Sequence, residues 1–321
     1  MIEYIIKRIL MMIPVLIGVS LLVFSLLHFA PGDPARIILG DDAPVEAIEA
    51  KREELGLNEP FLVQYVKYVT KIVTKGDLGN SFKSNRPVTE VILERYPTTL
   101  KMAGCCILMM VVMGLPIGII SAVKQYSLID NLAVTIGLVA VSMPNFWLGM
   151  VLIIIFSVKL KWLPASGFYG WNYWIMPAMT VGFSNAASLL RTTRSSVLEC
   201  IRQDYVVTAR AKGQKESVVI LHHVLRNALL PILTVIGISF GIMLGGAIVT
   251  EQIFSIPGIG KLMIDSINSR DYPVVQGAVL LVALSFSLAN LIVDIMYSII
   301  DPRIQIKGAK KIKGAEKYDE N

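Results

Sequence analysis

The residues able to do chemistry gather in one polar stretch, residues 204–231, which reads DYVVTARAKGQKESVVILHHVLRNALLP. Uncharged apolar segments, 171–190 and 229–250, lie on either side of it. A stretch of this kind is either a solvated loop between two membrane spans or a binding surface for another protein. Its charge is basic, because four cations outnumber two acids: Arg210, Lys212, Lys215 and Arg226 against Asp204 and Glu216.

The same stretch predicts two short helices broken at Gly213. Val206 to Ala211 can continue a helix, and glycine suits the left-handed position that follows a helix end. A second apolar-periodic run begins at Val218, and Pro231 is expected to open the next apolar segment.

Val207-Thr208-Ala209 and Gly213 resemble the Glu-Ala-Ala and glycine places of the cytoplasmic coupling loop of ABC importer permeases. The dipeptide/oligopeptide/nickel permeases are the most similar subgroup. The glutamate is missing here, and the proline arrives late, at Pro231. In that family the loop forms a short helix that sits in a cleft of the ATPase subunit. The resemblance therefore implies a set of coupling residues: Asp204, Tyr205, Thr208, Ala209, Arg210, Ala211, Gly213, Arg226 and Asn227.

Enzyme motifs are missing from the sequence. Gly258-Ile259-Gly260-Lys261 lacks the earlier glycine and the following Ser/Thr of a phosphate-binding loop, so ATP must be hydrolysed by another chain. An intramembrane protease, the alternative from another class, needs HExxH or an activated serine. Ser184 has no histidine inside a span to activate it. We expect no catalytic residue and no cofactor bound by this chain.

Cysteine and histidine do not predict a metal site. Cys105 and Cys106 are adjacent in an apolar segment, Cys200 lies in the basic loop, and no CxxC occurs. The histidines lack metal-ligand spacing as well, so we expect neither a disulfide nor a bound metal.

The segments that must position these residues are membrane spans. Hydrophobic residues make up 54% of the 321 residues and charged residues only 17%, against about a quarter charged in soluble domains. Six apolar runs lack Asp, Glu, Lys and Arg, and a central charge costs roughly 2.5–3.5 kcal/mol. The sequence predicts an all-α polytopic membrane protein with these spans: 9–30, 102–123, 132–158, 171–190, 229–250 and 274–293.

The spans divide the chain into an N-terminal span (1–30), a polar segment (31–100), a five-span core (101–300) containing the coupling loop (191–230), and a basic tail (301–321). The polar segment is expected to fold outside the membrane as an N-terminal insertion. Residues 46–55 and 61–75 have the pattern of amphipathic helices. The second carries aromatic residues at helical spacing: Phe61, Tyr65 and Tyr68.

Basic residues set the orientation. Seven Lys/Arg lie between 191 and 226 and six between 303 and 317, whereas the short loops on the other side carry few. Positive charge stays on the cytoplasmic side. Both termini and the coupling loop are therefore predicted to be cytoplasmic. The net charge is +6, but the basic residues do not alternate with aromatic residues as they do on a nucleic-acid-binding surface.

Three features lie inside the predicted spans or at their ends. Gly237, Gly241 and Gly245 recur every four residues, which permits close helix approach within this subunit, at a subunit interface or at a pore wall. Pro144-Asn145 breaks the third span, as a local unwinding or a kink. Asp294, near an interface, is assigned no transport role.

Short motifs between the spans extend the resemblance over nearly the whole chain: Pro31–Pro34, Lys75–Ser81, Arg95–Leu100, Leu163–Gly167, Pro257–Gly260, Arg270–Pro273 and Asp301–Arg303. The resemblance implies a bacterial inner-membrane importer. Its partners would be a second homologous permease, two ATPase subunits, an extracytoplasmic binding protein and membrane lipid.

Substrates of that family include short peptides, nickel and nickel chelates. Spans without carboxylates disfavour a bare metal ion and suit a charge-balanced solute such as a zwitterionic peptide. We therefore expect di- or oligopeptides, with nickel or a nickel chelate as the alternative.

Overall fold

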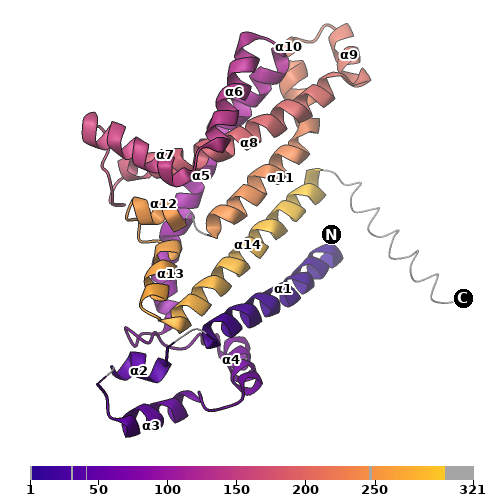
Figure 1. The fold of residues 1–321 in the computed structure, drawn as a ribbon. Coiled ribbons are helices and arrows are strands. Elements are labelled where there is room, and N and C mark those ends of the chain that lie inside the picture. Colours follow the sequence, from indigo (N-terminus) through magenta and orange to yellow (C-terminus); the bar gives the residue numbers. More distant parts are fainter. Residues whose placement is uncertain (1, 30–31, 41, 246–247, 301–321) are drawn as a thin grey trace, which may run out of the picture.

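The computed structural model describes residues 2–29, 32–40, 42–245 and 248–300 (Figure 1). These residues form helices and turns without a strand, so the all-α prediction is confirmed. The expected basic tail, 301–321, lies outside the described residues. The helices are α1 (Ile2–His28), α2 (Pro34–Leu39), α3 (Val45–Leu55), α4 (Phe61–Lys75), α5 (Val88–Val123), α6 (Leu128–Ser142), α7 (Asn145–Leu152), η1 (Ile153–Lys159), η2 (Trp171–Trp174), α8 (Ile175–Ile201), α9 (Asp204–Ala211), α10 (Glu216–Val218), η3 (Val219–Val224), α11 (Leu225–Leu244), α12 (Ile248–Ile253), α13 (Ile259–Asn268) and α14 (Tyr272–Ile300).

Four helices of the described chain are long and apolar enough to cross a membrane. They are Ile5–His28, Val88–Val123, Glu216–Leu244 and Tyr272–Tyr297. A fifth span results if α6 and the helix from Asn145 to Lys159 cross as one unit, although a bend of 102° separates them. The break expected at Pro144 is therefore present, and it is far sharper than a proline kink.

The fourth predicted span, 171–190, falls on α8, which is too polar to meet the same criterion, so the count of six is not reproduced by apolar helices alone. α8 packs against α5, α6, α7 and α11, and Leu189, Thr193 and Val197 on it are fully buried. Because its neighbours surround it, this helix can carry Asn185 and Arg194. Its 27 residues span about 40 Å, which is long enough for a membrane crossing.

Small residues bring α5 and α8 into close contact. A Cβ added at Gly114 would lie 2.7 Å from the Ala186 carbonyl oxygen, and one added at Gly118 would lie 2.9 Å from that of Leu190. From the other side, a Cβ on Gly182 would lie 2.8 Å from Met109 Cβ. The two backbones therefore approach each other at glycines, an arrangement common between membrane helices.

The glycine stripe of α11 faces α14 of the same chain. A Cβ on Gly237 would lie 1.9 Å from Val293 Cγ2, and one on Gly241 would lie 2.9 Å from Phe286 Cδ2. Of the three locations open from the sequence, the described residues place these two glycines in a contact within the subunit. α14 also contacts α1, where Arg8 forms an ion pair of 2.9 Å with Asp294.

The polar segment between α1 and α5 forms three helices, α2 to α4, gathered at one end of the molecule (Figure 1). α3 ends at Gly56 and α4 at Gly76, both left-handed, with φ of 69° and 63°. α4 has the bounds predicted from the sequence. The segment does not continue to residue 100 as a separate unit, because α5 begins at Val88 and includes Pro97.

Candidate functional site

α9 and the turn after it lie at the end of the bundle opposite α2–α4 (Figure 1). Two side chains anchor this short helix: Val206 is fully buried and Ala209 is 7% exposed. Both belong to the core cluster that includes Val219, Val224 and Val197. The remaining side chains of α9 are exposed, so α9 is fixed on one face and open on the other.

The turn at Gly213 ends α9 as the sequence predicts. Gly213 has φ 73°, and its N–H donates to the Arg210 carbonyl oxygen at 2.9 Å. The Gln214 N–H donates to the Ala209 carbonyl oxygen at 3.4 Å. This pair of bonds is the Schellman arrangement, which needs a left-handed residue at the Gly213 position. No other atom lies within 4 Å of a Cβ added there, so backbone conformation alone selects glycine.

Arg210 and Glu216 close the turn across its mouth. Arg210 Nε donates to Glu216 Oε2 at 3.1 Å, and its Nη2 donates to Oε1 at 2.6 Å. The hydrogen bond to Glu216 raises the pKa of Arg210 above its usual value. Both side chains are exposed, so water and salt screen the pair. It orients the turn more than it stabilises the fold.

The second of the two short helices predicted around Gly213 is not separate from the membrane helix that follows it. α10, the π-helical turn η3 and α11 run on as one helix from Glu216 to Leu244, and Pro231 lies inside α11. The expectation that Pro231 opens a new segment is therefore wrong. A proline is tolerated inside a membrane helix because neighbouring groups can satisfy the freed carbonyl.

His223 ties the turn to this helix, and Asn227 bonds back to His223 within the helix. His223 Nε2 lies 2.7 Å from Gln214 Oε1. Asn227 Nδ2 donates to the His223 carbonyl oxygen at 2.8 Å. Asn227 and Arg226 are exposed, on the first turn of α11 beside the α9 turn.

The structure thus places the predicted coupling residues on one protruding unit. Those exposed are Asp204, Tyr205, Thr208, Arg210, Ala211, Gly213, Arg226 and Asn227, whereas Ala209 is buried as an anchor. Two apolar side chains outside the predicted set of coupling residues extend the exposed surface, since Val207 is 60% and Leu221 59% exposed. A protruding helix with charged and apolar groups is suited to dock on another protein.

A buried ion pair joins three helices near the same end. Arg194 on α8 donates two hydrogen bonds of 2.7 Å to the Asp130 carboxylate on α6. Ser121 on α5 and the Tyr126 N–H also donate to this carboxylate. The Asp130 side chain is 2% exposed. The sequence reading missed this pair, because only the fold brings Asp130 and Arg194 together.

Beside α7 and α13, the turn after α12 is built around the buried carboxylate of Glu251. Its Oε1 accepts from the Thr99 hydroxyl at 2.9 Å, and its Oε2 accepts from the Lys261 N–H at 2.9 Å. A Cβ on Gly258 would lie 2.2 Å from Glu251 Oε1. The Pro257–Gly260 motif therefore wraps the carboxylate at the start of α13, where a helix N-terminus favours an anion.

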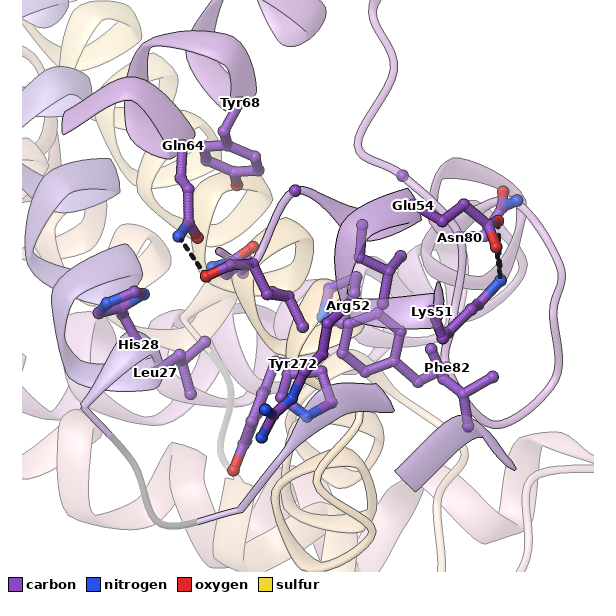
Figure 2. A pocket seen from close by; sticks show the side chains of 18 of the residues that line it. Leu27, His28, Lys51, Arg52, Glu54, Gln64, Tyr68, Asn80, Phe82 and Tyr272 are labelled. Carbon is purple, nitrogen blue, oxygen red and sulfur yellow. Dashed lines mark hydrogen bonds and ion pairs between the residues drawn. The ribbon is translucent and has the colours of Figure 1, made fainter. Parts of the chain in front are cut away.

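A cavity of about 1230 Å³ opens among α3, α4, the end of α1 and the start of α14. Figure 2 shows Arg52 and Lys51 from α3, Gln64 and Tyr68 from α4, and Tyr272 around it. Its lining has charges of both signs, many of them paired with each other: Lys51 with Glu54, Arg52 with Asp33 and Lys67 with Glu59. Among the described residues no group of three His, Cys, Asp or Glu side chains could hold a metal.

The chain is similar to known membrane transport proteins. Residues 114–306 match the family model "Binding-protein-dependent transport system inner membrane component", and residues 1–103 match its N-terminal companion. Two relatives named "Glutathione transport system permease protein GsiC" are 45% identical (Escherichia coli K12) and 46% identical (Pectobacterium atrosepticum) over 307 residues, which cover 96% of this chain and all of each relative.

Solved structures show a similar fold. A subunit of the inward-facing MetNI methionine ABC transporter aligns with a TM-score of 0.56 at 18% identity, over 66% of this chain and 97% of that one. A second crystal form of the same transporter gives 0.55 at 17% identity, over 66% and 96%.

Proposed function

This chain belongs to the family of binding-protein-dependent transport system inner membrane components, and from that premise we propose that it moves short peptides through a bacterial cytoplasmic membrane. The observation that carries the substrate class is the identity of 45% to glutathione transport permeases over their whole length. Glutathione is a small tripeptide, and the apolar runs predicted as spans hold no Asp or Glu that could bind a bare metal ion.

ATP drives transporters of this type through partner ATPase subunits, and a binding protein delivers the substrate. We propose the full assembly as this chain with a second homologous permease, two ATPase subunits and an extracytoplasmic binding protein. This chain has no phosphate-binding loop, so it is expected to hold no nucleotide or other cofactor and to catalyse no reaction.

The coupling surface is proposed to be α9, the Gly213 turn and the first turn of α11. Val206 and Ala209 fix α9 to the helix that becomes α11, and α11 packs on α8 and α14. A push on α9 from an ATPase subunit would therefore reach the central helices through packed side chains. Such rigid transmission can bias the helices between inward-open and outward-open arrangements.

For topology we propose that α8 also crosses the membrane, since it is long enough and enclosed by its neighbours. This brings the number of crossings to six. Six crossings place both termini in the cytoplasm together with α9. Residues 32–87 then lie on the extracytoplasmic side, with the cavity of Figure 2 facing the binding protein.

Uptake by a strain lacking this gene tests the substrate class. The chain's own gene, restored on a plasmid, should return uptake of labelled glutathione or of a labelled dipeptide. A plasmid with the Gly213→Val variant is the matched control for coupled transport. If nickel accumulation falls in the deletion strain while uptake of both peptides is unchanged, the peptide proposal is wrong and the metal alternative holds.

A further inference from the structure

The helix α4 leaves one apolar face uncovered. Leu62, Val66 and Val73 are 68%, 60% and 78% exposed. Their spacing of four and seven residues puts them in one stripe along the helix. Residues of this kind are normally covered by protein or by lipid when they form a continuous stripe.

The contacts of α4 fix its depth along α1. The ring of Phe24 on α1 lies 5.5 Å from Phe61, 5.5 Å from Tyr65 and 5.4 Å from Tyr68 (centroid distances). The Tyr65 hydroxyl reaches deeper still, 2.8 Å from the Ser20 hydroxyl. Because α1 is a membrane span that ends at His28, α4 crosses it about 6 Å inside that end.

The opposite side of α4 is polar. Lys67 and Lys71 line the cavity of Figure 2 together with Gln64, and Lys67 is paired with Glu59. At 100° per residue, these lysines lie on the far side of the helix from Leu62 and Val73. A third face, with Phe61 and Tyr65, rests on α1. The helix therefore has three different faces: one packs on α1, one lines the polar cavity, and one is the uncovered apolar stripe.

We propose that α4 is an interfacial helix lying in the membrane surface at the His28 end of α1, with Leu62, Val66 and Val73 buried in lipid. An interfacial helix places its apolar face about 5–10 Å into the boundary between headgroups and acyl chains, which matches the depth set by Phe24.

Lipid is the occupant that the neighbouring surface favours. On α1, Leu22 and Leu26, two residues either side of Phe24, are 59% and 64% exposed. A spanning helix exposes such residues to acyl chains. The stripe on α4 thus lies at the level of an existing lipid-facing surface, and the lysines stay in water.

Nitroxide labels in the assembled transporter, reconstituted in phosphatidylcholine–phosphatidylglycerol bilayers, test this proposal. Single cysteines replace Leu62 and Val73 in a chain without Cys105, Cys106 and Cys200. Collision rates with oxygen and with a water-soluble nickel chelate are then measured. The oxygen-to-nickel ratio should be several-fold higher for Leu62→Cys and Val73→Cys than for Lys71→Cys on the same helix.

Two reference positions calibrate the ratio: Leu22→Cys on α1 for lipid and Val45→Cys on α3, 76% exposed, for water. A ratio at positions 62 and 73 equal to that at 45 would place α4 in water and overturn the proposal. Low collision rates with both reagents would show a protein covering the stripe, which also overturns it. Because the side chains at 62 and 73 are exposed, either replacement removes little packing, and one suffices if the other fails to assemble.

Discussion

Thr99 on α5 and Glu251 on α12 are joined by a hydrogen bond of 2.9 Å, although 152 residues separate them. The Thr99 oxygen also accepts from the Ile259 N–H at 2.8 Å. One hydroxyl therefore connects the long helix α5, the buried acid and the first turn of α13. Glu251 is fully buried, and a buried carboxylate that loses a donor is costly because water cannot replace it.

Thr99→Val should destabilise the protein, since it removes the hydroxyl at nearly constant shape. An unmade hydrogen bond at a buried group costs about 1–3 kcal/mol. Thr99→Ser keeps the hydroxyl and serves as the matched control. The thermal midpoint of the purified protein in detergent, followed by size-exclusion fluorescence, should fall for Val and fall much less for Ser. Equal midpoints for the two variants would mean that the hydroxyl stabilises nothing.

Local patterns predicted local structure well. α4 follows from its apolar periodicity and the Gly76 stop, and the Gly213 turn follows from glycine's access to positive φ. The break before Asn145 follows from proline. These features depend on residues close together in the sequence.

Long-range contacts explain what the sequence could not provide. The Asp130–Arg194 pair and the Thr99–Glu251 bond join segments whose proximity only the fold creates. Apolar composition identifies helices that face lipid, whereas α8 is enclosed by protein and can carry polar residues. Proline ends most helices of soluble proteins, which is why the sequence predicts a boundary at Pro231. A membrane helix tolerates proline in its interior.

Gly213→Val should abolish transport while the protein stays in the membrane. A non-glycine residue in the left-handed region costs roughly 1–2 kcal/mol, more for a β-branched one, and relief of that strain would open the turn that ends α9. Gly213→Asn is the control, because asparagine tolerates this conformation. Peptide uptake is compared at equal membrane abundance, and full uptake by the valine variant would contradict the role of the turn.

Gly237→Ala should weaken the contact between α11 and α14, because the new methyl group would lie 1.9 Å from Val293 Cγ2. Overpacking a close contact costs about 1–3 kcal/mol. The double variant Gly237→Ala with Val293→Ala makes room for the methyl and should recover part of the lost thermal midpoint. If the second change instead adds to the damage, the two helices do not meet at this pair.

Cysteines at Gln214 and Glu59 test the proposed topology. Gln214 lies in the α9 turn and Glu59 directly before α4, at opposite ends of the molecule. In a chain without its native cysteines, an impermeant thiol reagent added to intact cells should label position 59 and leave position 214 unlabelled until the membrane is opened. The reverse pattern would invert the orientation.

Arg210→Glu should lower transport several-fold. A charge swap with Glu216 shows whether Arg210 acts by closing the turn or by contacting the ATPase subunit. The substitution puts two acids across the mouth of the turn, where Arg210 now donates two hydrogen bonds to Glu216. Arg210→Glu with Glu216→Arg restores that pairing with the charges exchanged. If the pair serves only to close the turn, the double variant should transport normally.

We expect the swap to fail, because Arg210 is exposed on the face of α9 proposed to meet the ATPase subunit. Complementary charges across an interface set the register of docking. The exchange would replace the cation at position 210, on the proposed interface, with an acid. The measurement is peptide-stimulated ATP hydrolysis by the assembled transporter, with co-purification of the ATPase as the second readout. Restored hydrolysis in the double variant would assign Arg210 to the turn alone.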